Sequence, residues 1–173
     1  MIKKDGNTMI IDTFRDLKSS SAEFNKAKRK TVKLIVKSAE HDQKVIDIIN
    51  ALKEMRDLEW VEIQNPDAKL CSIDGMLYSR NGKDLYFCAR TGAVEIPDGT
   101  KTICEGAACN CMLSELVIPD SVKHIKNFAF FGSCMLEEVK GGSGITDIED
   151  SVFLNCVRLK KFNIGKNMKH IGD

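Results

Sequence analysis

The chain has 173 residues, of which 43% are hydrophobic and 29% are charged, so its composition is globular and excludes disordered and collagen-like classes. Its 26 basic and 25 acidic side chains leave a net charge of +1, which gives no electrostatic reason to expect nucleic-acid or membrane-surface binding. Seven cysteines is an odd number, which argues against a fully paired disulfide framework and favours reduced thiols.

The first residues do not resemble a secretory signal. Their lysines are followed by only three consecutive apolar residues, Met9 to Ile11, and no apolar stretch of the chain approaches membrane-spanning length. We therefore expect a cytoplasmic protein without membrane insertion. A cell-surface or secreted location is the alternative if the full protein has a signal peptide that this sequence lacks.

Two helices are expected in the first third of the chain. One spans residues 14–28, with Thr13 as its candidate cap, and its basic end, Lys26–Lys30, is interpreted as a solvated face, with nucleic-acid or lipid contact as the alternative. The other spans residues 41–56. The apolar residues that align on one face are Phe14, Leu17, Phe24 and Ala27 in the first helix and Val45, Ile49, Leu52 and Met55 in the second.

Strands with the spacing Leu-x-x-Φ-x-Φ, where Φ is apolar, surround the second helix. Leu58, Val61 and Ile63 fit this template, and a looser match lies 27 residues earlier, ending at Leu34 and Val36. Residues 1–64 are therefore expected to form an N-terminal α/β section of long repeat-like units.

A β-hairpin insertion is expected over residues 65–90. Two apolar-rich runs there flank Asn81-Gly82, a pair that suits a type I′ turn because both central residues of that turn need positive φ.

Short tandem repeats fill residues 91–173. Ile103, Ile125, Ile148 and Ile171 recur at intervals of 22, 23 and 23. Further columns recur at matching intervals, and they contain Ala107, Ala129 and Val152; Cys111, Cys134 and Cys156; and Leu113, Leu136 and Leu159. After each of these leucines comes an apolar residue at +3 and, except where Gly141 stands, another at +5. Stacked repeats would pair such strands in a parallel sheet. Residues 107–111 and their counterparts are expected to form one helical or 3₁₀ turn on the far side.

The segment EIPDGTKTICEGAACNCMLSELVIPDSVKHIKNFAFFGSCMLEEV resembles the BspA-like (Treponema-type) leucine-rich repeats, whose units read approximately IPDSVxxIGxxAFxGCxxLxxVxI. The resemblance implies an α/β solenoid: a right-handed superhelix with a parallel sheet on its concave face, here preceded by the helical section and the hairpin. It also implies proteins of host-associated bacteria and some protozoa, often displayed on the cell surface and active in adhesion. Residues 140–144 (KGGSG) depart from the repeat pattern, and we interpret them as a flexible or bulged strand exit.

No catalytic constellation stands out. His124, Asp147 and His170 share one repeat column, which we interpret as a solvated turn face, with a divalent-metal site as the alternative. His41 has no nucleophile motif near it. The cysteines lack Cys-x-x-Cys spacing, and Cys109 and the Cys111, Cys134 and Cys156 column are interpreted as buried packing residues. We therefore expect no enzyme activity, no cofactor and no metal.

The residues at the third and fifth strand positions should point onto the concave face. The third-position column holds Lys33, Trp60, Ala93, Glu115, Glu138 and Lys161, and the fifth holds Ile35, Glu62, Glu95, Val117, Lys140 and Asn163. The single tryptophan, Trp60, is interpreted as an interface anchor, with packing against the core or the hairpin as the alternative. The predicted partner-binding residues are Trp60, Glu62, Glu95, Glu115, Val117, Glu138 and Lys140.

These observations favour a non-catalytic module that binds another protein through the concave face. A fragment of a surface adhesin is the first alternative and a structural spacer is the second. Because no capping repeat follows Ile171, we also expect either a longer natural protein or self-association through the open C-terminal end.

Overall fold

The computed structural model describes residues 1–17, 22–38 and 44–173, which form two compact units, Met1–Arg80 and Asn81–Asp173. Each unit is described by itself. Residues 18–21 of the expected helix 14–28 lie outside the described residues. The same holds for residues 41–43 of the expected helix 41–56, among them His41. The division into sections 1–64, 65–90 and 91–173 stays a prediction.

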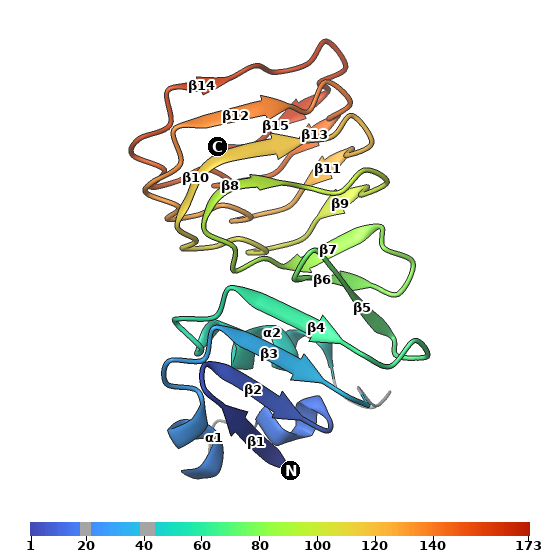
Figure 1. Ribbon diagram of the computed structural model, residues 1–173. Helices are drawn as coiled ribbons and strands as arrows, with labels where there is room; N and C mark the ends of the chain where they lie inside the picture. The colour runs from blue at the N-terminus through green and yellow to red at the C-terminus, as the bar shows by residue number, and fades with distance from the viewer. Residues whose placement is uncertain (18–21, 39–43) are drawn as a thin grey trace. The chain divides into compact units, whose positions relative to one another are not determined.

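A four-stranded sheet organises the first unit, in the order β1-β2-β3-β4 (Figure 1). β1 (Ile2–Asp5) and β2 (Thr8–Ile11) are antiparallel, whereas β3 (Lys33–Val36) and β4 (Trp60–Ile63) are added in parallel. Lys33 pairs with Trp60 and Val36 with Ile63, which confirms the 27-residue spacing of the two expected strands. The β1–β2 hairpin was not expected, because its strands alternate too weakly over four residues each.

Short helices cover the apolar residues of this sheet. In place of one helix over residues 14–28, the described residues contain a 3₁₀ helix, η1 (Phe14–Leu17), and α1 (Ala22–Ala27). α2 (Val45–Lys53) ends before residue 56 and lies behind β3 and β4 in Figure 1. The expected facial residues are buried apart from Val45, which is half-buried: Phe14, Leu17, Phe24, Ala27, Ile49, Leu52 and Met55.

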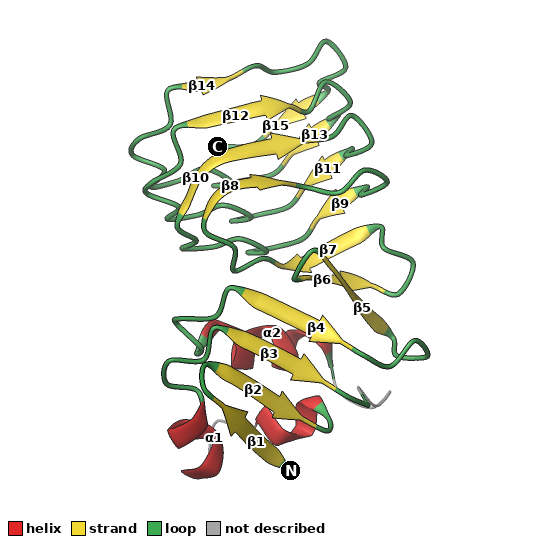
Figure 2. Ribbon diagram, viewed as in Figure 1, coloured by secondary structure: helices red, strands yellow, loops and turns green. Residues whose placement is uncertain are grey.

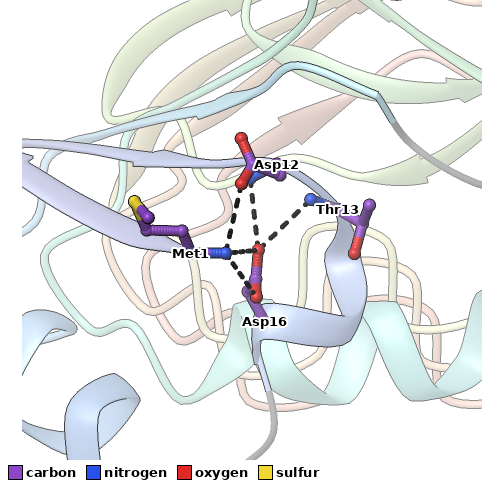
Figure 3. Close-up of polar contacts among 4 residues, drawn as sticks. All are labelled: Met1, Asp12, Thr13 and Asp16. Carbon is purple, nitrogen blue, oxygen red and sulfur yellow. Dashed lines mark hydrogen bonds and ion pairs between the residues drawn. The ribbon is translucent and has the colours of Figure 1, made fainter.

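The chain start is tied to η1 by polar contacts (Figure 3). The ammonium group of Met1 lies 2.9 Å from Oδ1 of Asp16 and 3.2 Å from Oδ2 of Asp12. Asp16 Oδ2 also accepts hydrogen bonds from the backbone N–H groups of Asp12 and Thr13. The carboxylate of Asp16 therefore holds the two backbone N–H groups that directly precede η1.

A second hairpin joins β5 (Leu70–Ile73) to antiparallel β6 (Met76–Ser79). Its two turn residues, Asp74 and Gly75, have φ values of 49° and 76°, as a type I′ turn requires. The same geometry was expected at Asn81-Gly82, and that expectation was wrong because only Gly82 has a positive φ. Asn81 instead accepts a hydrogen bond on Oδ1 from the N–H of Lys83, at 3.0 Å.

The second unit contains two parallel sheets and no helix in residues 81–173, all of which the structure describes (Figure 2). Each repeat gives one strand to each sheet. The first sheet has the order β14-β12-β10-β8, built from β8 (Gly92–Glu95), β10 (Leu113–Ile118), β12 (Glu138–Gly141) and β14 (Lys161–Phe162). The second comprises β7 (Asp84–Phe87), β9 (Thr102–Ile103), β11 (His124–Ile125), β13 (Asp147–Ile148) and β15 (His170–Ile171).

The apolar columns of the repeats fill the core of this unit. The isoleucine column Ile103, Ile125 and Ile148 is at most 5% exposed, and Leu113, Leu116, Leu136 and Val139 are at most 2% exposed. Burying these columns removes apolar surface from water, which is the main favourable contribution to folding.

A stack of turns connects the second sheet back to the first. Within residues 104–111, the N–H groups of Ala107, Cys109 and Cys111 bond to the carbonyl three residues earlier, as in a 3₁₀ turn. The N–H groups of Ala108 and Asn110 bond instead to Ala129 and Phe131 of the next repeat. Because alternate N–H groups bond to the neighbouring repeat, the segment forms isolated 3₁₀-type turns, one of the two expected alternatives, and not a helical turn.

In one repeat, the expected cysteine column is filled by the residue before the expected cysteine. Asn110, Gly132 and Asn155 have φ between 58° and 69°, and the residue after each donates a side-chain hydrogen bond to the preceding repeat. Those donors are Cys111 Sγ to Cys88 O at 2.8 Å, Ser133 Oγ to Ala108 O at 2.9 Å, and Cys156 Sγ to Phe130 O at 3.1 Å. Ser133 therefore takes the place expected for Cys134, which is exposed, while Cys109 and Cys111 are only partly buried.

Candidate functional site

The candidate site is the outer face of the first sheet in the second unit, formed by the strand side chains that point away from the core. The expected third-position column is confirmed by the register, in which Glu115 pairs with Ala93 and Glu138, and Glu138 with Lys161. In the fifth-position column Val117 pairs with Glu95 and Lys140. The five predicted binding residues of this unit therefore lie on adjacent strands of one face: Glu95, Glu115, Val117, Glu138 and Lys140.

Opposite charges alternate across this outer face. Lys140 Nζ lies 2.7 Å from Glu115 Oε2 and 3.7 Å from Glu138 Oε2, and Lys161 Nζ lies 3.8 Å from Glu138 Oε1. The hydrogen bond to Glu115 raises the pKa of Lys140 above its ordinary value. The two lysines therefore neutralise much of the charge of Glu115 and Glu138.

A small cavity of about 190 Å³ opens on the same face. Its rim contains one hydroxyl and three carboxyl side chains from two repeats, and two lysines from the next repeat. The lining residues are Ser114, Glu115, Glu137, Glu138, Lys160 and Lys161. Sequence reasoning missed Ser114, Glu137 and Lys160, the residues directly after the column leucines, because strict alternation sends that position to the core side. The register shift between Leu113 and Glu115 is the irregularity that turns Ser114 to the cavity.

Trp60 and Glu62 belong to the first unit, where β4 holds them. The indole of Trp60 packs against the turn of the β5–β6 hairpin, since a Cβ on Gly75 would lie 2.5 Å from its ring. This is the hairpin-packed alternative, and Trp60 is half-buried. Lys33 Nζ lies 5.9 Å from the ring centroid and 2.6 Å from Glu62 Oε2, and hydrogen bonds from Lys33 and Gln64 lower the pKa of Glu62.

The histidine column lies on the second sheet, at its solvent side. Thr102, His124, Asp147 and His170 are in register on neighbouring strands, as the repeat spacing predicted. His124 Nδ1 lies 3.1 Å from Asp147 Oδ2. The hydroxyl of Thr146, followed by the neighbouring histidines, lowers the pKa of Asp147. Within the described residues, no three His, Cys, Asp or Glu side chains converge as a metal site would need.

Burial makes two cysteines poor nucleophiles. Desolvation raises the pKa of Cys88 to about 11 and that of Cys104 to about 12. Both thiols therefore stay protonated near neutral pH, and a thiol attacks as the thiolate. All seven cysteines are free in the structure.

The repeat region of the chain matches a known protein family. Residues 82–173 match the family model described as "BspA type Leucine rich repeat region", with six copies. No curated protein matches the chain in sequence. None of the helices in the described part of the chain is long and apolar enough to cross a membrane.

Solved structures that are similar to this chain are distant from it in sequence. The pneumococcal vaccine antigen PcpA is 21% identical with a TM-score of 0.61, and the alignment covers 83% of this chain and 34% of that one. A leucine-rich repeat protein of Bacteroides capillosus is 21% identical with a TM-score of 0.53, covering 59% of this chain and 87% of that one. A leucine-rich repeat protein of T. pallidum is 23% identical with a TM-score of 0.46, covering 51% of this chain and 56% of that one. The chain thus spans little more than half of the T. pallidum protein and about a third of PcpA.

Proposed function

Because the chain belongs to the BspA-type leucine-rich repeat family, we propose that it is a non-catalytic module that binds a protein partner through the outer face. The observation that carries the proposal is the 190 Å³ cavity bordered by carboxylates and lysines of adjacent strands. A partner that fits this face presents charged side chains of both signs, so that each carboxylate and each lysine finds an opposite charge.

The ion pairs within the outer face can be replaced by ion pairs to such a partner. Exposed salt bridges contribute at most about 1 kcal/mol each, so breaking them on binding costs little. Glu115 and Lys140 are nearly half exposed, with side-chain exposures of 46% and 47%. A partner that covers them would exclude water and strengthen the new pairs.

The finer architecture belongs to the same proposal. We take the stacked repeats to form a right-handed solenoid with the outer face on its concave side, and extended concave surfaces are what repeat proteins use for binding. Trp60 and Glu62, on β4, are proposed as partner-binding residues of the first unit.

Charge reversal tests the proposal. Glu115→Lys with Glu138→Lys should abolish capture of a partner from a lysate of the source organism, because Lys140 and Lys161 then face like charge. The matched control, Asp98→Lys with Glu105→Lys, makes the same change in net charge at exposed positions away from the outer face and should leave capture intact. Equal capture by both variants would sink the proposal, provided circular dichroism shows both folded.

A segment of a cell-surface adhesin is the second candidate, and the fold shared with a protein described as a vaccine antigen favours testing it. We prefer a cytoplasmic module over the surface or secreted alternative. Capture from the source lysate, compared with capture of host matrix proteins, separates them. A structural spacer would bind neither, and self-association through β14 and β15 would appear as a dimer in light scattering.

A further inference from the structure

The first unit carries a basic cavity that the outer face does not involve. It has a volume of about 700 Å³ and is lined by the loop after α1 and by the end of α2. Its lining contains five basic side chains and two acidic ones, a net charge of +3, in a chain whose net charge is +1. The lining residues are Lys28, Arg29, Lys30, Lys53, Glu54, Arg56 and Asp57.

Both carboxylates of the basic cavity are already engaged. Glu54 Oε2 lies 2.7 Å from Lys28 Nζ, and Asp57 Oδ2 accepts a hydrogen bond from the backbone N–H of Lys30 at 3.1 Å. Four cationic side chains therefore remain, and in the described residues none of them forms an ion pair: Arg29, Lys30, Lys53 and Arg56. On the outer face, by contrast, Lys140, Lys160 and Lys161 all lie within 4 Å of a carboxylate.

The backbone carbonyls at the end of α1 do not repel an anion from the cavity. The carbonyls at a helix C-terminus carry partial negative charge, which would repel one. Here the Ala27 carbonyl accepts hydrogen bonds from Lys4 Nζ at 2.9 Å and from Thr31 Oγ1 at 2.7 Å. Lys4 also donates to the carbonyl of Arg29. The field in the cavity therefore follows the net charge of +3 of its lining.

We propose that the basic cavity binds a small ligand that carries at least two phosphate or sulfate groups. Two guanidinium forks and two ammonium groups supply donors for more than one oxyanion, and Arg binds such groups bidentately. A volume of this size is typical of small-ligand sites rather than of an extended polyanion track. The same chemistry is found in a free phosphorylated or sulfated metabolite and in a lipid headgroup.

Titration calorimetry of the full chain with inorganic tripolyphosphate tests this site. We expect saturable binding that weakens at least about tenfold in Lys53→Gln with Arg56→Gln, since two charge-assisted contacts are lost. The matched control, Lys101→Gln with Lys166→Gln, removes the same charge from exposed positions of the second unit and should change the affinity less than about twofold. An unchanged unfolding midpoint shows that each variant is folded.

Sedimentation with cardiolipin vesicles, in which each headgroup carries two phosphates, identifies the source of the ligand. Vesicle binding that tripolyphosphate displaces indicates a lipid headgroup, whereas tripolyphosphate binding without vesicle binding indicates a free metabolite, and both support the site. Equal weakening in the two variants, or no binding of either probe by the unmodified chain, would overturn it.

Discussion

Two glycines with positive φ have very different surroundings. Gly99 has a φ of 90° and open space around an added Cβ, whereas Gly141 has a φ of 77° and an added Cβ would lie 2.3 Å from the carbonyl oxygen of Ile118. Gly99→Ala should cost about 1–2 kcal/mol of unfolding free energy, from backbone strain alone. Gly141→Ala should cost a further ~1–3 kcal/mol, because the neighbouring backbone must move. Urea unfolding measures both, and equal costs would contradict the close approach in the structure.

Cysteine reactivity separates exposed from buried positions. Cys134 is exposed, whereas burial holds the pKa values of Cys88 and Cys104 at about 11 and about 12. Iodoacetamide at neutral pH should therefore label Cys134 first and these two last, as read by peptide mass spectrometry. Cys134→Ser should remove the fast phase. Faster labelling of Cys88 or Cys104 would show that the assigned burial is wrong.

The shift of the cysteine column shows what sequence spacing leaves open at single residues. A spacing of 22 or 23 residues fits both Ser133 and Cys134, and cysteine identity favoured the wrong one. The positive φ of Gly132 decides the matter, because it turns the next side chain inward. Phe128 and Ser151 also have positive φ at matching repeat positions. This could not be predicted from the sequence, since neither residue type favours that conformation.

At the scale of elements, the side-chain donors of Cys111, Ser133 and Cys156 join each repeat to the preceding one. Ser133 is fully buried, and Ser133→Ala should cost about 1 kcal/mol through loss of its hydrogen bond to Ala108 O. Ser133→Cys should stay near the stability of the unmodified chain, because cysteine makes the same bond in both neighbouring repeats. Urea midpoints compare the two. Equal destabilisation would mean that the hydroxyl, rather than the column, is required.

The contact between the chain start and η1 depends on pH. Burial would raise the pKa of Asp16, but hydrogen bonds from the Met1 ammonium, Thr13 and Asp12 outweigh it and hold that pKa below its ordinary 3.8. The hydrogen bond to Asp16 raises the pKa of the terminal amine above 8.0. The stabilisation from Asp16 is therefore complete above about pH 4 and lost as pH falls through its lowered pKa. The contribution of the amine is complete below pH 8.0 and lost as pH rises through its raised pKa.

Thermal unfolding across this pH range checks the contact. Asp16→Asn should lower the melting temperature mainly between these two limits and flatten both limbs of the profile. Asp5→Asn, at an exposed position of β1, is the control and should leave both limbs in place. If the two variants give the same profile, the ammonium contact does not contribute in solution.

Long-period signals predicted elements better than local ones did. The parallel pairing of β3 with β4 and of the strands after residue 91 followed from repeat spacing, because a stacked repeat fixes register over many positions. At Asn81-Gly82 only the turn type was predicted wrongly, because positive φ is found at Gly82 alone, whereas Asp74-Gly75, with the same local chemistry, has positive φ at both residues. The two-residue strands of the second sheet are too short for any alternation to show.

On the scale of the whole molecule, a net charge of +1 conceals two distinct charged surfaces. Composition gave no reason to expect nucleic-acid or membrane-surface binding, and the run Lys26–Lys30 was interpreted as a solvated face. Four cations that form no ion pair within the described residues nevertheless line the basic cavity of the first unit. Their assembly depends on tertiary structure, since Arg29 and Lys30 come from one loop and Lys53 and Arg56 from another part of the chain. The residues of the outer-face columns, in contrast, were predicted from the repeat spacing. Only the ion pairs among them were not predicted.

Hydrogen–deuterium exchange on a complex with a captured partner tests the outer face most directly. We predict that binding slows exchange in peptides that cover β10 and β12, because a partner on this face excludes water from these strands. The stacked turns of residues 104–111, on the other side of the core, should exchange at the same rate with and without the partner. Protection confined to those turns, or no protection of β10 and β12 in a saturated complex, would contradict the account.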